Sequence, residues 1–308
     1  MEEFSPVVDN ASGRHPSRLA MKVPTRLGAL GVEVTGAGPD TILWSSMFVD
    51  RTSWDRLVPL LPDRRLILVD GPGLGRSDAL RTRTSIAEAA DAALDLLAAL
   101  RADGMISQEA PAWVGNAFGG HVGFELAVQP GVLSSLVAIS APPEPIPAAL
   151  RRQIRMLRPL LQLVGPAGPV RAAILSGMVT EAAANDPVVR ELVEASLARP
   201  TRRSLTLALD SFILDRADVT GHLSRIAVPA LYLAGDDRGD WSPVDAARAA
   251  ESTPRAESVT IERARTLLPL EQPHAVAVAL RAFWAESSSD SLARHTSRAL
   301  LRGSRHER

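Results

Sequence analysis

The stretch AWVGNAFGGHVGFEL, residues Ala112–Leu126, decides the fold of this chain. Its first part, AWVGN, is an apolar run with the length of a buried strand, and the part after the glycines is typical of a helix. Gly115 and Gly119 stand two residues to either side of Ala117. Glycines are needed at such places when a strand turns so sharply into a helix that a Cβ would collide with the neighbouring chain. The stretch therefore predicts a strand, a tight turn with Ala117 at its tip, and a helix.

The spacing of Gly115, Ala117 and Gly119 is that of the G-x-S-x-G nucleophile elbow. In that motif the residue at the tip of the turn is the nucleophile. Here the tip residue is Ala117, whose methyl group has no atom that can attack a substrate. The sequence thus predicts the backbone of an elbow without its reactive side chain.

Composition narrows the class of protein. The chain has 308 residues, of which 46% are hydrophobic, enough for one large α/β domain with an insertion or for two small domains. The net charge of −1 gives no electrostatic reason to expect nucleic acid or a membrane surface as a partner. The absence of cysteine excludes disulfides, thiolate metal sites and a cysteine nucleophile.

Two further features bear on where the protein works. No apolar run approaches the roughly 20 residues of a membrane span, and the acidic N-terminus has no apolar core typical of a secretory signal. We therefore expect a soluble, cytoplasmic protein. Of the 34 basic residues only Lys22 is a lysine, which indicates the coding bias of a GC-rich bacterial genome.

Segments typical of strands and helices alternate on both sides of the elbow. Strands are expected at 26–35, 41–46, 65–70, 133–140, 229–235 and 257–262, and helices at 53–61, after the capping box of Ser85 and Glu88, from Pro243, and at 272–285. Residues 142–220 contain no strand-like run and are expected to form several helices. The pattern predicts the α/β class, with a doubly wound, mostly parallel sheet and a helical insertion after the fifth or sixth strand.

Several motifs in this order resemble those of the α/β-hydrolase superfamily with a helical cap. They are DGPGLGRS at 70–77, GNAFGG at 115–120, AGDD at 234–237 and LLPLEQP at 267–273, and the resemblance spans residues 25–286. It implies a core of residues 23–141 and 221–286 and a cap of residues 142–220. A flexible N-terminal segment, 1–22, and a polar, basic tail, 287–308, complete the expected organisation.

Hydrolysis in this superfamily requires a nucleophile, a histidine base and an acid that orients the histidine. The resemblance places Ala117 at the nucleophile position and Thr266, five residues before Glu271, at the histidine position. Asp237 stands at the acid position, with Asp240 as the other candidate. Two of the three positions are therefore empty, which is a degenerate catalytic triad. The six histidines lack the spacing of a metal site, and for His121 we expect a packing role.

The resemblance also implies an oxyanion hole. Its two donors would be the backbone N–H of Phe118 and that of Met47. Such donors do not depend on side-chain identity and can stabilise an enolate, phenolate or alkoxide in a dry pocket. The catalytic candidates are Asp237, Asp240 and Thr266, and both aspartates have a loop-anchoring or helix-capping role as an equal alternative. Expected substrate contacts are Trp44, Ser45, Ser46, Asn116, Trp241 and Met156.

Three functions fit these residues. The first is a cofactor-independent, non-hydrolytic enzyme acting on a hydrophobic small molecule between core and cap, such as a polyketide-like intermediate of secondary metabolism. Because superfamily members that have departed from hydrolysis include lyases, cofactor-free oxygenases and cyclases, the expected reactions are cyclisation, C–C bond formation, epoxide opening, isomerisation or elimination. The second is a ligand-binding or scaffold protein, and the third is a hydrolase with a displaced catalytic set. A homodimer is kept open as the oligomeric state.

Overall fold

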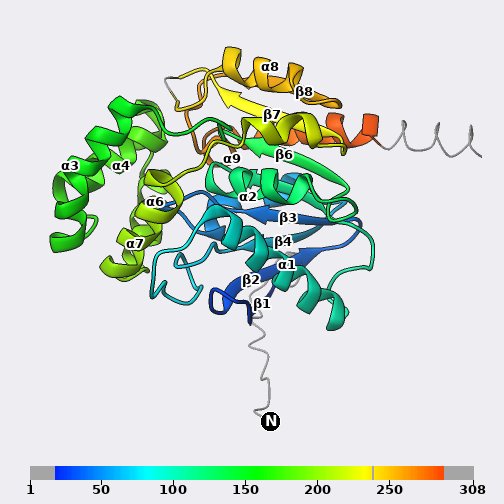
Figure 1. The fold of residues 1–308 in the computed structure, drawn as a ribbon, viewed down its shortest axis with the longest axis horizontal. Helices are drawn as coiled ribbons and strands as arrows, with labels where there is room; N and C mark the ends of the chain where they lie inside the picture. The colour runs from blue at the N-terminus through cyan, green and yellow to red at the C-terminus, as the bar shows by residue number, and fades with distance from the viewer. Residues whose placement is uncertain (1–17, 238, 288–308) are drawn as a thin grey trace, which may run out of the picture.

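The computed structural model describes residues 18–237 and 239–287, which form an α/β protein built on an eight-stranded sheet (Figure 1). The strand order is β1-β2-β4-β3-β5-β6-β7-β8. The pairs β1–β2 and β2–β4 are antiparallel, and all the other neighbouring pairs are parallel. The strands are β1 (Leu19–Val23), β2 (Leu30–Gly36), β3 (Asp40–Trp44), β4 (Arg65–Val69), β5 (Ala112–Asn116), β6 (Ser135–Ile139), β7 (Ala230–Gly235) and β8 (Ala256–Ile261).

Helices cover both faces of this sheet, which explains its continuous apolar runs. Every residue of β3, β5, β6 and β7 is buried, as expected of parallel strands packed on both sides. One hydrophobic cluster joins the sheet to α1 (Ile86–Ala102), α2 (Phe118–Ala127) and α8 (Pro243–Glu251). A second cluster joins the opposite face to η1 (Arg51–Trp54), η2 (Val58–Leu60), α9 (Leu268–Glu271) and the helix over 273–287.

The cap follows β6 and lies at the carboxyl ends of the parallel strands, on the left in Figure 1. The insertion therefore comes after the sixth strand, the second of the two expected positions. Its helices are α3 (Ala148–Val164), α4 (Gly168–Met178), α5 (Glu181–Asn185), α6 (Pro187–Ala198) and α7 (Arg202–Leu209), with the π-helical turn η3 (Asp210–Leu214) after α7 and the 3-10 helix η4 (Thr220–Arg225) leading back to the core. The two ends of the insertion meet, because Val219 N–H donates to the carbonyl of Pro143 at 2.9 Å.

Two local expectations are wrong. Residues 19–22, expected within the flexible segment, form β1 together with Val23. This edge strand is defined by its ladder to β2, and only Val23 is fully buried. The helix expected at 53–61 consists of the two short 3-10 helices η1 and η2, because Pro59 has no N–H for an α-helical bond. Residues 1–17 and the expected tail beyond Ser287 lie outside the described part of the chain. None of the described helices is both long enough and apolar enough to cross a membrane.

Candidate active site

The elbow has the predicted geometry. Ala117 joins β5 to α2 with φ 46° and ψ −104°. A Cβ on Gly115 would lie 2.1 Å from the carbonyl of Gly119, and a Cβ on Gly119 would lie 2.2 Å from the carbonyl oxygen of Trp44. Both glycines are therefore required by close backbone contacts, as the sequence spacing indicates.

Hydrogen bonds hold the elbow in this conformation. Ala117 N–H donates to the carbonyl of Ile139 at 2.7 Å. The Asn116 amide donates to the same carbonyl at 3.1 Å and to the carbonyl of Thr266 at 2.8 Å. Asn116 thus joins the elbow to the loop before α9 and does not line the cavity described below, so the expected substrate contact is replaced by a structural one.

A cavity of about 240 Å³ lies between the elbow and the cap. Ala117, Phe118, Met47, Ser46 and Thr266 form its floor on the core side. Phe118 stacks on Phe212 of η3 with ring centroids 4.1 Å apart, so the floor continues directly into the cap. Apart from Arg158 and Arg216, the cap wall is apolar, and it includes Leu150, Ile154, Leu157 and Leu161 of α3 and Val170, Ala173, Ile174 and Met178 of α4.

Two backbone donors at this floor are unoccupied. Phe118 is the first residue of α2, and the first N–H groups of a helix have no acceptor within it. Within the described part of the chain, neither Phe118 N–H nor Met47 N–H has a hydrogen-bond acceptor. Both residues are buried and line the cavity.

Four expected substrate contacts lie elsewhere. Trp44 is fully buried and stacks on Trp113 with centroids 5.3 Å apart, and Trp241 packs against Tyr232 in the core. The Ser45 hydroxyl accepts a hydrogen bond from Trp54 Nε1 at 3.1 Å. The side chain of Met156 is 73% exposed on the outer face of α3. Large apolar side chains suit a core as well as a pocket, so sequence alone does not separate these uses.

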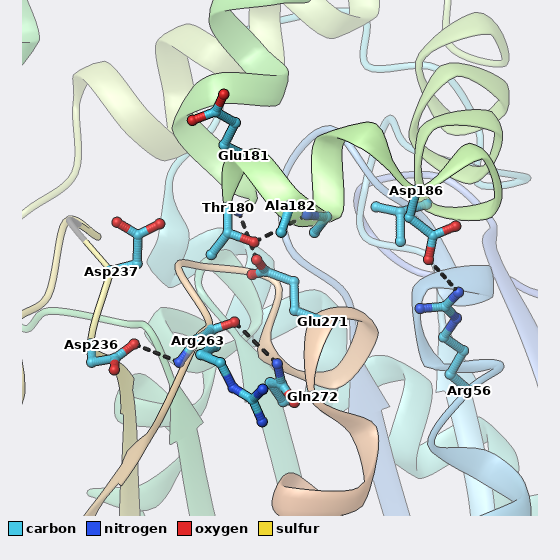
Figure 2. A pocket seen from close by; sticks show the side chains of 12 residues that line it. Arg56, Thr180, Glu181, Ala182, Asp186, Asp236, Asp237, Arg263, Glu271 and Gln272 are labelled. Carbon is cyan, nitrogen blue, oxygen red and sulfur yellow. Dashed lines mark hydrogen bonds and ion pairs between the residues drawn. The ribbon is translucent and has the colours of Figure 1, made fainter.

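The two candidate acids are separated. Asp240 lines the cavity and accepts from Arg216 Nη1 at 2.8 Å. Asp237 pairs with Arg265 Nη2 at 2.9 Å and lines a second, open cavity of about 870 Å³, in which Figure 2 shows it beside Asp236. The elbow cavity therefore brings Ala117 and Thr266 together with Asp240 and not with Asp237.

Glu271 stands in the second cavity and joins cap to core. Its carboxylate accepts from the backbone N–H of Thr180 in the cap at 2.7 Å (Figure 2). It also accepts from the backbone N–H of Arg265 in the core at 3.0 Å. Burial raises the pKa of Glu271, and the two N–H donors oppose part of that rise. The LEQP motif therefore has a structural use here.

A polar group at the elbow cavity is not among the expected residues. It consists of His121 of α2, Ser140 at the end of β6, and Arg216, which pairs with Asp240. His121 Nε2 lies 3.0 Å from the carbonyl of Pro142, while its Nδ1 is buried without a partner. The carboxyl end of a strand beside the elbow strand is a signal that points to Ser140. For Arg216 we find no sequence signal.

The charge state of His121 follows from its surroundings. Burial, together with the positive charge of Arg216, lowers the pKa of His121 to about 3, against an ordinary value of 6.5. The imidazole is therefore neutral at physiological pH. Across residues 18–237 and 239–287, no group of three or more histidine and carboxylate side chains is arranged to hold a metal ion.

The sheet, the elbow and the inserted cap define a protein of the α/β-hydrolase fold. The chain belongs to the alpha/beta hydrolase family, an enzyme family whose model matches residues 34–279. RutD of Pseudomonas syringae pv. syringae (strain B728a), which is named as a carbamate hydrolase, is 32% identical over 250 residues, covering 80% of this chain and 93% of its own length.

Solved structures show the same fold. A thermophilic esterase from Thermogutta terrifontis has a TM-score of 0.76 at 24% identity, with 87% of this chain and 98% of the esterase covered. The enol-lactonase from Burkholderia xenovorans LB400 has a TM-score of 0.74 at 18% identity, with 86% of this chain and all of the lactonase covered.

Proposed function

We propose that this chain is a cofactor-independent enzyme that converts a hydrophobic small molecule without hydrolysis and without a covalent intermediate. The observation that carries the proposal is the combination of a methyl group at the elbow tip, Ala117, with an apolar cavity and two unoccupied N–H donors beside it. The reactions that fit are cyclisation, C–C bond formation, epoxide opening, isomerisation or elimination on an intermediate of secondary metabolism.

The proposed chemistry is stabilisation of negative charge as it develops. Met47 N–H and Phe118 N–H supply fixed dipoles at a buried floor, and the Phe118 donor adds the positive end of the α2 dipole. An enolate, phenolate or alkoxide oxygen placed there is stabilised more strongly than in water, because the donors are already oriented. The apolar cap wall excludes water and positions the rest of the substrate.

The size of the cavity limits the substrate. At about 240 Å³ it is slightly below the range of roughly 300–1,000 Å³ common for small-molecule sites. A one- or two-ring compound fits this space, whereas a long polyketide chain would place only its reacting part inside. We therefore expect the substrate to be a compact, largely apolar molecule.

A hydrolase with a displaced catalytic set is the second candidate, because RutD, which is 32% identical to this chain, is named as a carbamate hydrolase. His121 and Ser140 line the same cavity, but no hydrogen bond joins His121 Nδ1 to the Ser140 hydroxyl. With a pKa of about 3, the imidazole of His121 is also a weak base. These two facts favour the non-hydrolytic proposal.

The test begins with the metabolites that accumulate when the gene is deleted. We expect the purified protein to convert one of these metabolites to a product of equal mass or to one that has lost water. The variant Ala117→Leu, whose side chain fills the cavity, should keep the fold but abolish this conversion. A serine-directed fluorophosphonate should not label the protein. Labelling of Ser140 or Ser46 would overturn the proposal in favour of a hydrolase, and tight binding without product would identify a ligand-binding protein.

A further inference from the structure

The elbow cavity has one polar end whose hydrogen-bonding capacity is unused. His121 Nδ1 and the Ser140 hydroxyl are both buried without a partner, in side chains that are 5% and 4% exposed. Both residues line the cavity. A buried polar atom that lacks a partner is unfavourable, so a ligand that supplies the missing bonds gains affinity.

The protonation state of His121 determines which hydrogen-bonding group a ligand must present at this end of the cavity. The carbonyl of Pro142 can only accept, so the proton lies on Nε2 and Nδ1 presents a lone pair. The imidazole is neutral, because burial and Arg216 together disfavour the charged form. His121 therefore needs a hydrogen-bond donor from the ligand.

Ser140 supplies the complementary role. Its backbone has φ 49° and its N–H is bound to the carbonyl of Leu233 at 2.8 Å, so the position of the residue is fixed. Its hydroxyl can donate to a ligand oxygen while that oxygen's own proton goes to His121 Nδ1. A hydroxyl is the group that donates and accepts through one atom.

The charged side chains that line the cavity are paired, which favours a neutral ligand group. Arg158 donates to both carboxylate oxygens of Asp210, each at 2.6 Å. Arg216 is paired with Asp240 at 2.8 Å and also donates from Nε to the carbonyl of Glu144 at 3.0 Å. The pair has no net charge, and the lone pair of His121 Nδ1 repels an anion. A carboxylate is therefore a poorer match than an uncharged hydroxyl.

We infer that His121 and Ser140 form a hydroxyl-binding subsite, and that the molecule bound in the elbow cavity is an alcohol, phenol or enol with an apolar body. This names the substrate class and rests on the proposed function only in taking this cavity as the substrate site. Because a site built to bind a hydroxyl leaves its own groups unpaired when the hydroxyl is missing, the subsite also determines specificity.

Binding of two matched probes tests the subsite. 2-Naphthol and 2-methylnaphthalene have the same shape and differ in a hydroxyl against a methyl group. We expect the wild-type protein to bind 2-naphthol about tenfold more tightly, as two hydrogen bonds of modest net strength imply. A purely apolar cavity would give the opposite order, because the methyl compound leaves water more readily.

Two variants identify the residues. His121→Gln keeps a side-chain N–H for the Pro142 carbonyl but loses Nδ1, and Ser140→Ala loses only the hydroxyl. We expect each variant to reduce the preference for 2-naphthol severalfold and to leave the affinity for 2-methylnaphthalene unchanged, with circular dichroism reporting the fold. Equal binding of the two probes by the wild type, equal loss of both in His121→Gln, or no binding of 2-naphthol would overturn the inference.

The outcomes also separate this inference from the proposed function. Hydroxyl-selective binding in a protein that converts no metabolite would refute the enzyme and leave the subsite standing. Conversion of a metabolite by a protein that shows no hydroxyl preference would refute the subsite and leave the enzyme standing.

Discussion

At the scale of single residues, the elbow is held by its surroundings and not by the residue at its tip. Ala117 has a backbone conformation that non-glycine residues rarely adopt and that is unfavourable by about 1–3 kcal/mol. The hydrogen bonds from Ala117 N–H and Asn116 to β6 and to the Thr266 carbonyl keep it there. A different side chain at the tip should therefore leave the backbone unchanged.

This independence predicts that esterase chemistry can be installed. Ala117 and Thr266 line one cavity, and Asn116 fixes their loops relative to each other. We expect Ala117→Ser with Thr266→His to hydrolyse 4-nitrophenyl acetate about 10²-fold faster than Ala117→Ser alone, since a general base contributes on this order. Absorbance assays on the wild type, both single variants and the double variant measure this. Equal rates for the single Ala117→Ser and the double variant would contradict it.

His121 predicts a pH dependence of stability. Its pKa is about 3 in the folded protein and 6.5 in the unfolded chain, so between these values only the unfolded chain takes up the proton. The contribution of His121 to the unfolding free energy is therefore fully present above pH 6.5. It falls by about 1.4 kcal/mol per pH unit as the pH drops from 6.5 toward 3.

Urea unfolding at pH 7 and pH 5 measures this contribution. We expect the wild type to lose about 2 kcal/mol more unfolding free energy over this interval than His121→Gln, which does not titrate. Arg216, which faces His121, is present in both proteins and cancels in the comparison. The same loss in both proteins would show that His121 is not held neutral by the fold.

Six of the residues expected at the candidate site lie together in the structure. Ala117, Met47, Phe118, Ser46, Thr266 and Asp240 line the cavity as expected. Trp44, Trp241 and Met156 do not, because an apolar residue type gives no indication of which side of a helix or strand faces a ligand. Ser140 and Arg216 were missed, since their use depends on which chain segments meet and not on any local pattern.

At the scale of elements, the strand–elbow–helix unit depends on backbone contact. The glycine spacing predicted this unit, and the apolar runs predicted the parallel strands that flank it. The edge strand β1 and the 3-10 helices η1 and η2 escaped prediction because burial periodicity is weak in both.

Because Gly119 lies so close to the backbone of Trp44, adding one methyl group at Gly119 should lower the unfolding free energy strongly. We expect Gly119→Ala to lower the free energy of unfolding by about 3 kcal/mol or more, because the added Cβ meets a rigid carbonyl. Gly177→Ala in α4 is the control, since its Cβ meets nothing within 4 Å and should stabilise the helix by about 0.5–1 kcal/mol. Chemical denaturation compares the two, and equal effects would contradict the predicted collision.

At the scale of the whole molecule, many polar contacts fasten the cap to the core. The carbonyl of Met178 accepts from the N–H groups of Thr266 and Leu267, both at 3.2 Å. The Ser204 hydroxyl donates to the carbonyl of Gly73 at 3.0 Å, and the Ser211 hydroxyl accepts from Thr84 N–H at 3.1 Å. Together with Glu271, these contacts join α4, α7, η3 and the start of α5 to the core.

We therefore expect cap and core to unfold together. Differential scanning calorimetry should show a single transition whose calorimetric and van't Hoff enthalpies agree. Glu271→Ala leaves two partly buried N–H groups without an acceptor and should lower the unfolding free energy by about 2 kcal/mol, still in one transition. Two resolved transitions in the wild type would show that the cap is an independent unit.

The hydrogen bond between Val219 N–H and the Pro143 carbonyl holds the two ends of the cap together, so the cap can be replaced as a unit. The chain leaves the sheet and returns to it at neighbouring points, so a replacement insert needs only two ends of matching separation and leaves the strand ladder intact. Grafting another helical insert between these two residues would change which ligands enter the elbow cavity and would leave the floor of the cavity, which the core forms, unchanged.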